Sequence, residues 1–197
     1  MLKVAVLVSG GGTNLQAILD AVDSGKITNA KVEKVISNVA GAYALERAKN
    51  HGVQGVTLRR KDFENKAAWE QALINEIEDC GAQLIVLAGF MAILSENFTK
   101  HFENKIINVH PSLIPSFCGE GMYGLHVHEA ALAKGVKVSG ATVHFVNEEV
   151  DGGKIIAQKA VEVLAGDTPE TLQKRIMQQA EWIILPQAID DIANNRI

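Results

Sequence analysis

Residues 2–14, LKVAVLVSGGGTN, decide the class of fold. Leu2–Val8 is a short aliphatic run broken only by Lys3, and such a run bounded by turn residues predicts a buried strand. Three glycines follow, and the apolar residues of Leu15–Ser24 then recur with the spacing of a helix. A buried strand that turns at once into a helix predicts an α/β protein.

The same alternation continues along the chain. Further strands are predicted at Val32–Ser37, Leu84–Ala88 and Lys105–Val109, with helices at Ala42–His51, Lys66–Asp79 and Ser95–His101. A glycine-rich segment follows Pro111, and after it we expect strands at Gly140–Val146 and Lys154–Val163 and a long helix from about Pro169 to Asn194. The pattern predicts one α/β domain over residues 1–197, with a mostly parallel, open sheet flanked by helices.

The bulk composition excludes several classes of partner. The chain has 197 residues, 47% of them hydrophobic, which is enough for one core without disulfides or metal staples. Its net charge of -4 is scattered along the chain, so neither nucleic acid nor an anionic membrane is an expected partner. Cys80 and Cys118 are far apart and predicted to be free thiols, and Met1–Val8 is too short for a membrane span. We therefore expect a cytoplasmic protein.

The glycine loop Ser9–Asn14 joins the first strand to the first helix. Its glycines allow the backbone to approach a ligand, and the amides at a helix start favour an anion. The loop lacks the lysine of a nucleoside triphosphate loop, so a single phosphate ester is the better match. The alternative is a tight turn without a ligand, in which Thr13 or Asn14 caps the helix.

Asn108 and His110 lie two positions apart at the end of a predicted strand. Period two sends both side chains to the same face of the sheet. An amide and an imidazole directed at one point can stabilise a developing oxyanion and handle a proton, as formyl transfer to an amine requires. The alternative is that both residues only end the strand and bind loop backbone.

Asp151 precedes two glycines in a loop that leaves the strand containing His144. A carboxylate beside His110 would fix the orientation of the imidazole and raise its pKa toward the working pH. Taken alone, however, Asp-Gly-Gly is typical of a hairpin turn.

Together, these motifs resemble the glycinamide ribonucleotide formyltransferase family, and they agree with it in order and spacing over nearly the whole chain. The matching segments are Ser9–Asn14, Leu87–Met91, Asn108–Pro115, Gly124–His128 and Thr142–Gly153. The resemblance implies the formyltransferase fold, with a Rossmann-like N-terminal half. It also implies transfer of a formyl group from 10-formyltetrahydrofolate to the glycinamide amine in purine biosynthesis, with Asn108, His110 and Asp151 as the catalytic residues.

The resemblance also implies two binding sites and no metal. The ribonucleotide would be bound by Gly12, Thr13, Asn14 and Glu181. The folate co-substrate would be bound by Lys66, Phe90, Met91, Ala92, Ile93, Leu94, Asn108, Val146, Asn147, Glu148, Glu149, Val150 and Asp151. The expected partners are these two small molecules, and the expected state is a monomer or a homodimer.

Three features depart from the family pattern. Ala92 stands where many relatives carry Arg, and Lys66 stands near a position often occupied by Arg that meets the folate tail. The segment Phe117–Gly124 is longer than the Pro-Gly turn of many members. Its glycines suggest either a lid or rim near the site or a plain surface loop.

Other functions remain open at this stage. A formyltetrahydrofolate deformylase usually carries an N-terminal regulatory domain and methionyl-tRNA formyltransferase an extra C-terminal domain; because Met1 begins the first strand and the last helix ends near Ile197, we expect neither. A non-catalytic nucleotide-binding module would leave Asn108, His110 and Asp151 unexplained. A metal-dependent hydrolase could use its histidines as ligands, but the His126-Val127-His128 spacing on a helix does not favour one ion.

Overall fold

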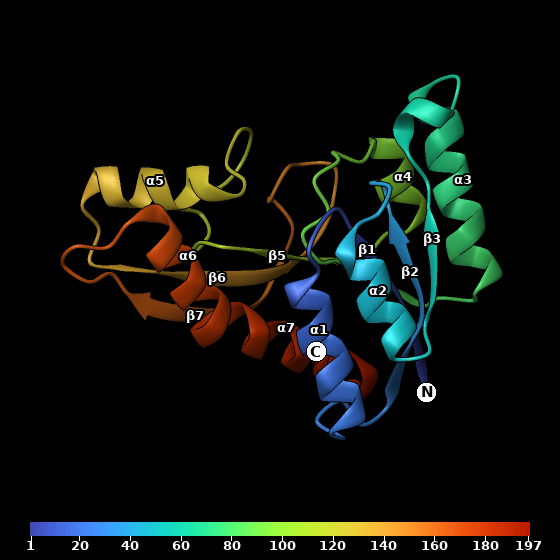
Figure 1. The fold of residues 1–197 in the computed structure, drawn as a ribbon, viewed down its shortest axis with the longest axis horizontal. Coiled ribbons are helices and arrows are strands. Elements are labelled where there is room, and N and C mark those ends of the chain that lie inside the picture. The colour runs from blue at the N-terminus through green and yellow to red at the C-terminus, as the bar shows by residue number, and fades with distance from the viewer.

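Seven strands form one continuous sheet in the computed structural model, which describes residues 1–197 (Figure 1). The strands are β1 (Leu2–Val8), β2 (Ala30–Ser37), β3 (Gln54–Thr57), β4 (Leu84–Leu87), β5 (Ile106–His110), β6 (Val138–Phe145) and β7 (Ile155–Glu162). Their order in the sheet is β3-β2-β1-β4-β5-β6-β7. The first five strands pair in parallel, whereas β6 and β7 add an antiparallel extension. The predicted α/β class and mostly parallel sheet are confirmed.

The strand order reverses between β1 and β4. From β1 the chain moves outward to β2 and β3, and then crosses back to β4 on the other side of β1. In open sheets of this kind the loops diverge at such a point and leave a crevice outside the carboxyl ends of the strands. The glycine loop after β1 and the segment after β4 both start at this edge.

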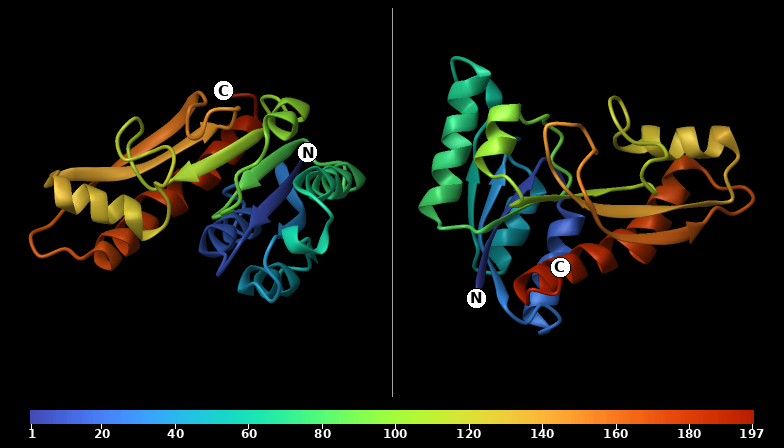
Figure 2. Two further views of the ribbon diagram at one scale, coloured as in Figure 1. Left: turned by 90° about the horizontal axis from the view of Figure 1, so that it is seen from above. Right: turned by 180° about the vertical axis from the view of Figure 1, so that it is seen from behind.

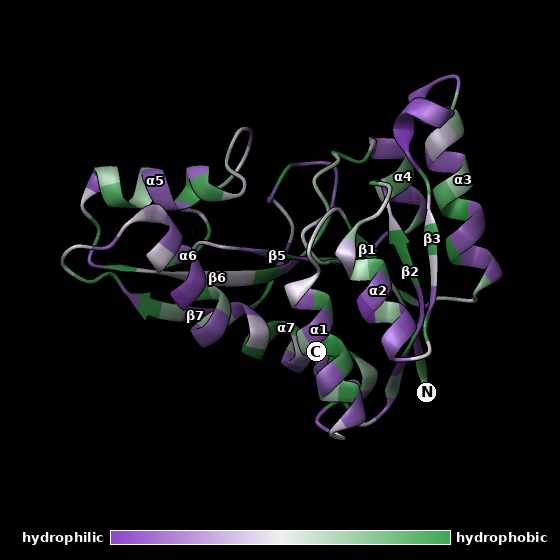
Figure 3. Cartoon of the chain, in the orientation of Figure 1, coloured by the Kyte–Doolittle hydropathy of each residue, from purple (hydrophilic) through white to green (hydrophobic).

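Helices cover both faces of the sheet. They are α1 (Thr13–Asp23), α2 (Tyr43–Asn50), a 3-10 turn (Arg60–Asp62), α3 (Lys66–Asp79), α4 (Glu96–His101), α5 (Leu125–Lys134), α6 (Pro169–Ile176), a π-helical turn (Met177–Glu181) and α7 (Trp182–Ala193). Alternate residues of β1 point to opposite faces, so Val4 and Val6 pack with α1 and α7 while Ala5 and Leu7 pack with α3 and α4. Figure 3 shows the apolar strands between helices whose outer faces are polar.

The C-terminal part of the chain crosses the molecule twice. Strands β6 and β7 extend away from β1–β4, and α6 and α7 lead back until the C-terminus lies beside α1 (Figures 1 and 2). This return is fixed by Asp190, whose Oδ1 accepts hydrogen bonds from the backbone N–H of Thr28 at 2.8 Å and from its hydroxyl at 2.9 Å. The C-terminal part of α7 is therefore held beside the segment that follows α1, at the end of α1 away from the glycine loop.

Three details differ from the sequence prediction. Strand β3 was not predicted, because it has four residues, lies at the sheet edge and contains Gly55. The long C-terminal helix is interrupted by the π-helical turn, and neither Thr13 nor Asn14 caps α1, since the N-cap is Gly12 with φ of 72° and no side-chain bond. Cys80 and Cys118 are free, and no helix is long and apolar enough to cross a membrane.

Candidate active site

A cavity of about 540 Å³ lies along the carboxyl edge of the sheet. Its volume is in the range of small-molecule sites. The walls come from the start of α1, the segment after β4, the end of β5, the loop before α5, the loop between β6 and β7, and the π-helical turn. Segments that are far apart in sequence therefore share one space.

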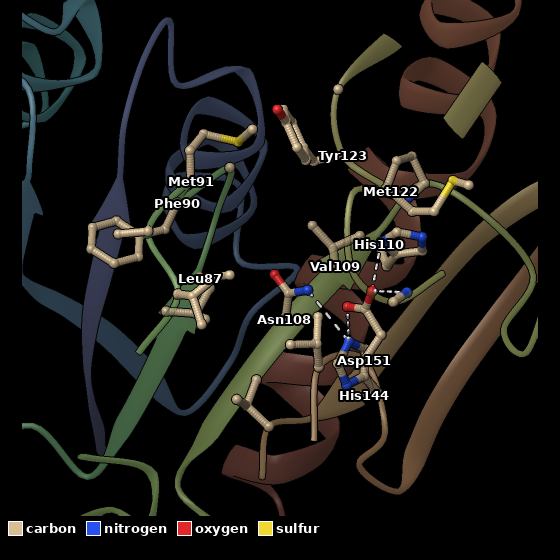
Figure 4. Close-up of a pocket in the computed structure, with 18 of the residues that line it drawn as sticks. Leu87, Phe90, Met91, Asn108, Val109, His110, Met122, Tyr123, His144 and Asp151 are labelled. Carbon is tan, nitrogen blue, oxygen red and sulfur yellow. Dashed lines mark hydrogen bonds and ion pairs between the residues drawn. The ribbon is translucent and has the colours of Figure 1, made fainter. Parts of the chain in front are cut away.

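Asn108 and His110 both project from β5 into this cavity, as their spacing predicts (Figure 4). The prediction that they share a face is confirmed. The Asn108 Nδ2 lies 3.3 Å from Nε2 of His144, which stands directly opposite it on β6. The Nδ1–H of His144 donates to the carbonyl of Phe145 at 2.8 Å, so its Nε2 is the atom that faces both Asn108 and Asp151.

Asp151 lies where it meets both histidines. Its carboxylate oxygens are 3.5 Å from Nδ1 of His110 and 3.5 Å from Nε2 of His144, and Oδ2 accepts the backbone N–H of Gly119 at 2.9 Å. Burial opposes ionisation of this carboxyl, but the hydrogen bonds from His144 and Gly119 and the nearby imidazoles outweigh it, and the pKa of Asp151 is lowered. The site thus contains a buried carboxylate anion between two imidazoles.

The pKa of His110 is lowered, not raised as the sequence analysis expected. Burial of the ring is the largest cause, and the opposing effects of the Phe117 carbonyl and the Asp151 charge are smaller. The Nε2–H donates to the Phe117 carbonyl at 2.8 Å, so the neutral ring has its lone pair on Nδ1, facing Asp151. At neutral pH His110 is therefore a neutral donor, and a proton added to Nδ1 would form an ion pair with Asp151.

One end of the cavity is formed by Thr13, Asn14 and Glu181. The Asn14 Nδ2 donates to Glu181 Oε2 at 2.7 Å, and both side chains are buried. Burial is the main cause that raises the pKa of Glu181 to about 6, against the hydrogen bond from Asn14. Gly12, the residue before Thr13, is not among the residues that line the cavity. The Oδ1 of Asn14 is buried and has no hydrogen-bond partner within the protein.

The other end is formed by two loops that carry the remaining predicted folate residues. Phe90–Leu94 and Val146–Asp151 line the cavity, and Met91, Ile93 and Val150 are exposed there. The Phe90 ring points away from His110 in Figure 4 and stacks on Trp69 at 6.3 Å between centroids. Lys66 lies outside the cavity, where its Nζ is 3.7 Å from Glu70.

The chain is similar in sequence and in fold to known formyltransferases. The formyl transferase family matches residues 2–189. Over 100% of its length, the chain is 41% identical to a phosphoribosylglycinamide formyltransferase of Escherichia coli, of which it covers 89%. It is 43% identical over 100% of its length to the enzyme of the same name from Haemophilus influenzae, of which it covers 90%. A glycinamide ribonucleotide transformylase from Symbiobacterium toebii superposes with a TM-score of 0.93 at 44% identity, covering 100% of this chain and 89% of that one. The chain belongs to the phosphoribosylglycinamide formyltransferase family.

The segment Phe117–Gly124 of this formyltransferase lies at the site. Residues Gly119–Gly124 line the cavity, the carbonyl of Phe117 binds His110, and the N–H of Gly119 binds Asp151. Phe117 adopts a φ of 51°, which is unusual for a residue with a side chain. Phe117–Gly124 is thus a rim of the cavity that contacts both predicted catalytic groups through its backbone.

Several lining residues of the formyltransferase were not predicted as ligands. His144 could have been found from its strand, since it alternates with Thr142 and faces Asn108. His128, Gln173 and Met177 come from helices and carried no comparable signal. In the metal-hydrolase alternative, whose ligands would be His110, His126, His128, His144 and Asp151, the neighbouring His126 and His128 diverge, with His126 exposed and His128 buried. No three His, Cys, Asp or Glu side chains are grouped to hold a metal ion.

Proposed function

We propose that this formyltransferase moves the formyl group of 10-formyltetrahydrofolate to the glycinamide amine of 5'-phosphoribosylglycinamide. The single observation that carries this is the continuity of one cavity. The Asn14–Glu181 pair lines one end, the Asn108–His110–Asp151 group lies between, and two apolar loops line the other. The names of the similar proteins support the same two-substrate reaction.

The ribonucleotide would lie at the Asn14 end. Its phosphate would face the backbone amides of Gly12, Thr13 and Asn14, because a helix start with unpaired N–H groups favours an anion. The Glu181 carboxylate would accept hydrogen bonds from the ribose or from the glycinamide end. This orientation points the amine toward His110.

The folate would lie at the opposite end. Met91, Ile93 and Val150 would cover the ring system, and backbone groups of Phe90–Leu94 and Val146–Asp151 would bind its polar edge. Lys66 would act on the tail only from outside the cavity, and Ala92 offers no charge to that tail.

Catalysis would come from orientation and from stabilisation of charge. The amine nitrogen first bonds to the formyl carbon, which gives a tetrahedral intermediate with a negative oxygen. The carbonyl then re-forms as the bond from that carbon to the folate nitrogen breaks, and the folate nitrogen keeps the electron pair and takes up a proton. The second N–H of Asn108 and the Nε2–H of His110 would donate to that oxygen, for which His110 must exchange its bond with Phe117. The proton that leaves the amine reaches the folate nitrogen through His110 Nδ1, beside Asp151, or through a water.

We further propose that the reaction takes place in the cytoplasm, since both cysteines are free thiols. The proposed partners are the two small molecules, and the enzyme would act as a monomer or a homodimer.

The deciding experiment incubates the purified protein with 10-formyltetrahydrofolate, with and without the ribonucleotide, and follows formation of tetrahydrofolate. Release that requires the ribonucleotide is the expected result. Release without it would replace the proposal by a deformylase activity, and no release under either condition would leave a non-catalytic nucleotide-binding protein.

A further inference from the structure

Two residues of helix α2 donate hydrogen bonds to carbonyl groups of the glycine loop. The carbonyl of Gly10 accepts the backbone N–H of Ala44 at 3.1 Å, and the carbonyl of Gly11 accepts the Nε–H of Arg47 at 2.7 Å. The packing is close, because a Cβ on Gly12 would lie 2.6 Å from the Cβ of Ala44. The conformation of the loop therefore depends on residues of α2.

These anchors decide where the loop's amides point. In a planar trans peptide the C=O of one residue and the N–H of the next point in opposite directions. Fixing the Gly10 and Gly11 carbonyls toward α2 directs the N–H groups of Gly11 and Gly12 away from it. These two groups, with those of Thr13 and Asn14, donate to no acceptor in the protein. Four donors are thus left for a ligand.

Arg47 is itself held in place on several sides. Its Nη1 donates to Oε1 of Gln16 at 2.9 Å, and its guanidinium lies 4.9 Å from the ring centre of Tyr43. Gln16 is in turn bound to Asp20 at 2.7 Å and lies 3.0 Å from the ring of His51. A planar fork that bonds to two acceptors at once is a property of arginine that lysine lacks.

We propose that Arg47 is a positioning residue for the phosphate of the ribonucleotide. It fixes the Gly11–Gly12 peptide so that the free amides face the anion, and it places one positive charge behind the loop without touching the substrate. This inference rests on the proposed function, because it assigns the phosphate to the glycine loop.

Two substitutions separate charge from geometry. Arg47→Lys retains the charge but loses the rigid fork whose two nitrogens bind Gly11 and Gln16, whereas Arg47→Gln loses both the charge and the fork. We expect the KM for the ribonucleotide to rise about tenfold in Arg47→Lys and more in Arg47→Gln, as the loss of one charge-assisted hydrogen bond implies. The turnover number and the KM for the formyl donor should stay within about twofold, since neither involves this peptide.

Ribose 5-phosphate provides a readout that does not depend on catalysis. Its dissociation constant, measured by calorimetry, should rise in parallel with the KM for the ribonucleotide. The matched control is Arg59→Gln, which removes an exposed ion pair with Asp62 away from the cavity and should leave every constant unchanged. Melting curves verify that each variant folds.

The inference is overturned if Arg47→Gln binds ribose 5-phosphate as wild type does. It is also overturned if the constants for both substrates and the melting temperature change together, because that pattern indicates a purely structural role. A wild-type protein that transfers no formyl group would refute the proposed function instead, while the ribose 5-phosphate measurement would still test Arg47.

Discussion

The two ends of the cavity are built on different principles. At the Asn14 end the polar groups are tied to one another, by the buried Asn14–Glu181 bond and by the exposed bond from Arg47 to the Gly11 carbonyl. At the other end the walls are loops, and their apolar side chains are open to solvent, with Met91 53%, Ile93 64% and Val150 45% exposed. A phosphate needs donors fixed in advance, whereas a flat ring needs apolar cover that can adjust. The difference teaches that the proposed ribonucleotide end is preorganised, whereas the proposed donor end offers an open apolar wall.

The largest effect is expected where the two ends meet. His110→Ala should lower the turnover number about 10³-fold, because it removes both a donor to the formyl oxygen and a proton acceptor. The KM for each substrate should change far less. Steady-state kinetics with a melting curve measure both, and normal turnover in a folded His110→Ala protein would refute the catalytic assignment.

Asp151→Asn should lower turnover about 10²-fold and change its pH dependence. In wild type, turnover should fall as acid protonates His110, at a pH below 6.5, because burial lowers the pKa of this ring. The Asp151 charge opposes that lowering, so its removal lowers the pKa of His110 further. The acid limb of the pH profile should therefore move to lower pH, and a shift to higher pH would contradict this account.

Glu181→Gln tests the Asn14 end of the cavity. It should weaken binding of the ribonucleotide but make the folded protein more stable at high pH. The KM for the ribonucleotide should rise about tenfold while that for the donor stays constant. The folded-state pKa of Glu181 is raised from 4.5 to about 6, so the protein is more stable with this group protonated and loses that stability as pH rises through about 6. At pH 8, where wild-type Glu181 is ionised, the Glu181→Gln variant should therefore be more stable than wild type by about 2 kcal/mol.

The check on Glu181→Gln compares two pH values. Denaturant unfolding at pH 4 and pH 8 should show the gain in stability only at pH 8, where wild-type Glu181 is ionised. An equal gain at both pH values would mean that the buried charge is not the cause.

The smallest effects are expected at the donor end. Met91→Ala and Val150→Ala each remove partly exposed apolar surface, so the KM for the formyl donor should rise about three- to tenfold. Turnover, the KM for the ribonucleotide and the melting temperature should be almost unchanged. If the KM for the ribonucleotide rose as much as that for the donor, the two ends would not be independent.

The strands that the sequence predicted most clearly are those whose residues nearly all lie in the protein interior. β1 and β4 are buried on both sides, so their continuous aliphatic runs were sufficient. β3 is half exposed and carries no such run. The π-helical turn at Met177–Glu181 was not predicted because its apolar spacing resembles that of the helices on either side.

The candidate site was predictable where local spacing determines direction. Asn108 and His110 share a face because a strand has period two, and that prediction needs no tertiary information. The contact of Asp151 with both histidines depends on how the loop after β6 folds back, and only the family resemblance suggested it. The direction of the His110 pKa shift was wrong because it depends on burial, which one strand's sequence does not give.

The Asn14–Glu181 hydrogen bond joins side chains separated by 167 positions. During synthesis the glycine loop leaves the ribosome early, but its partner in the π-helical turn emerges only when nearly the whole chain has been translated. A chain that lacks the Glu181 segment would lack one side of the proposed ribonucleotide site. Protection of the glycine loop by ribose 5-phosphate would therefore report that the segment carrying Glu181 has been made and has docked on α1.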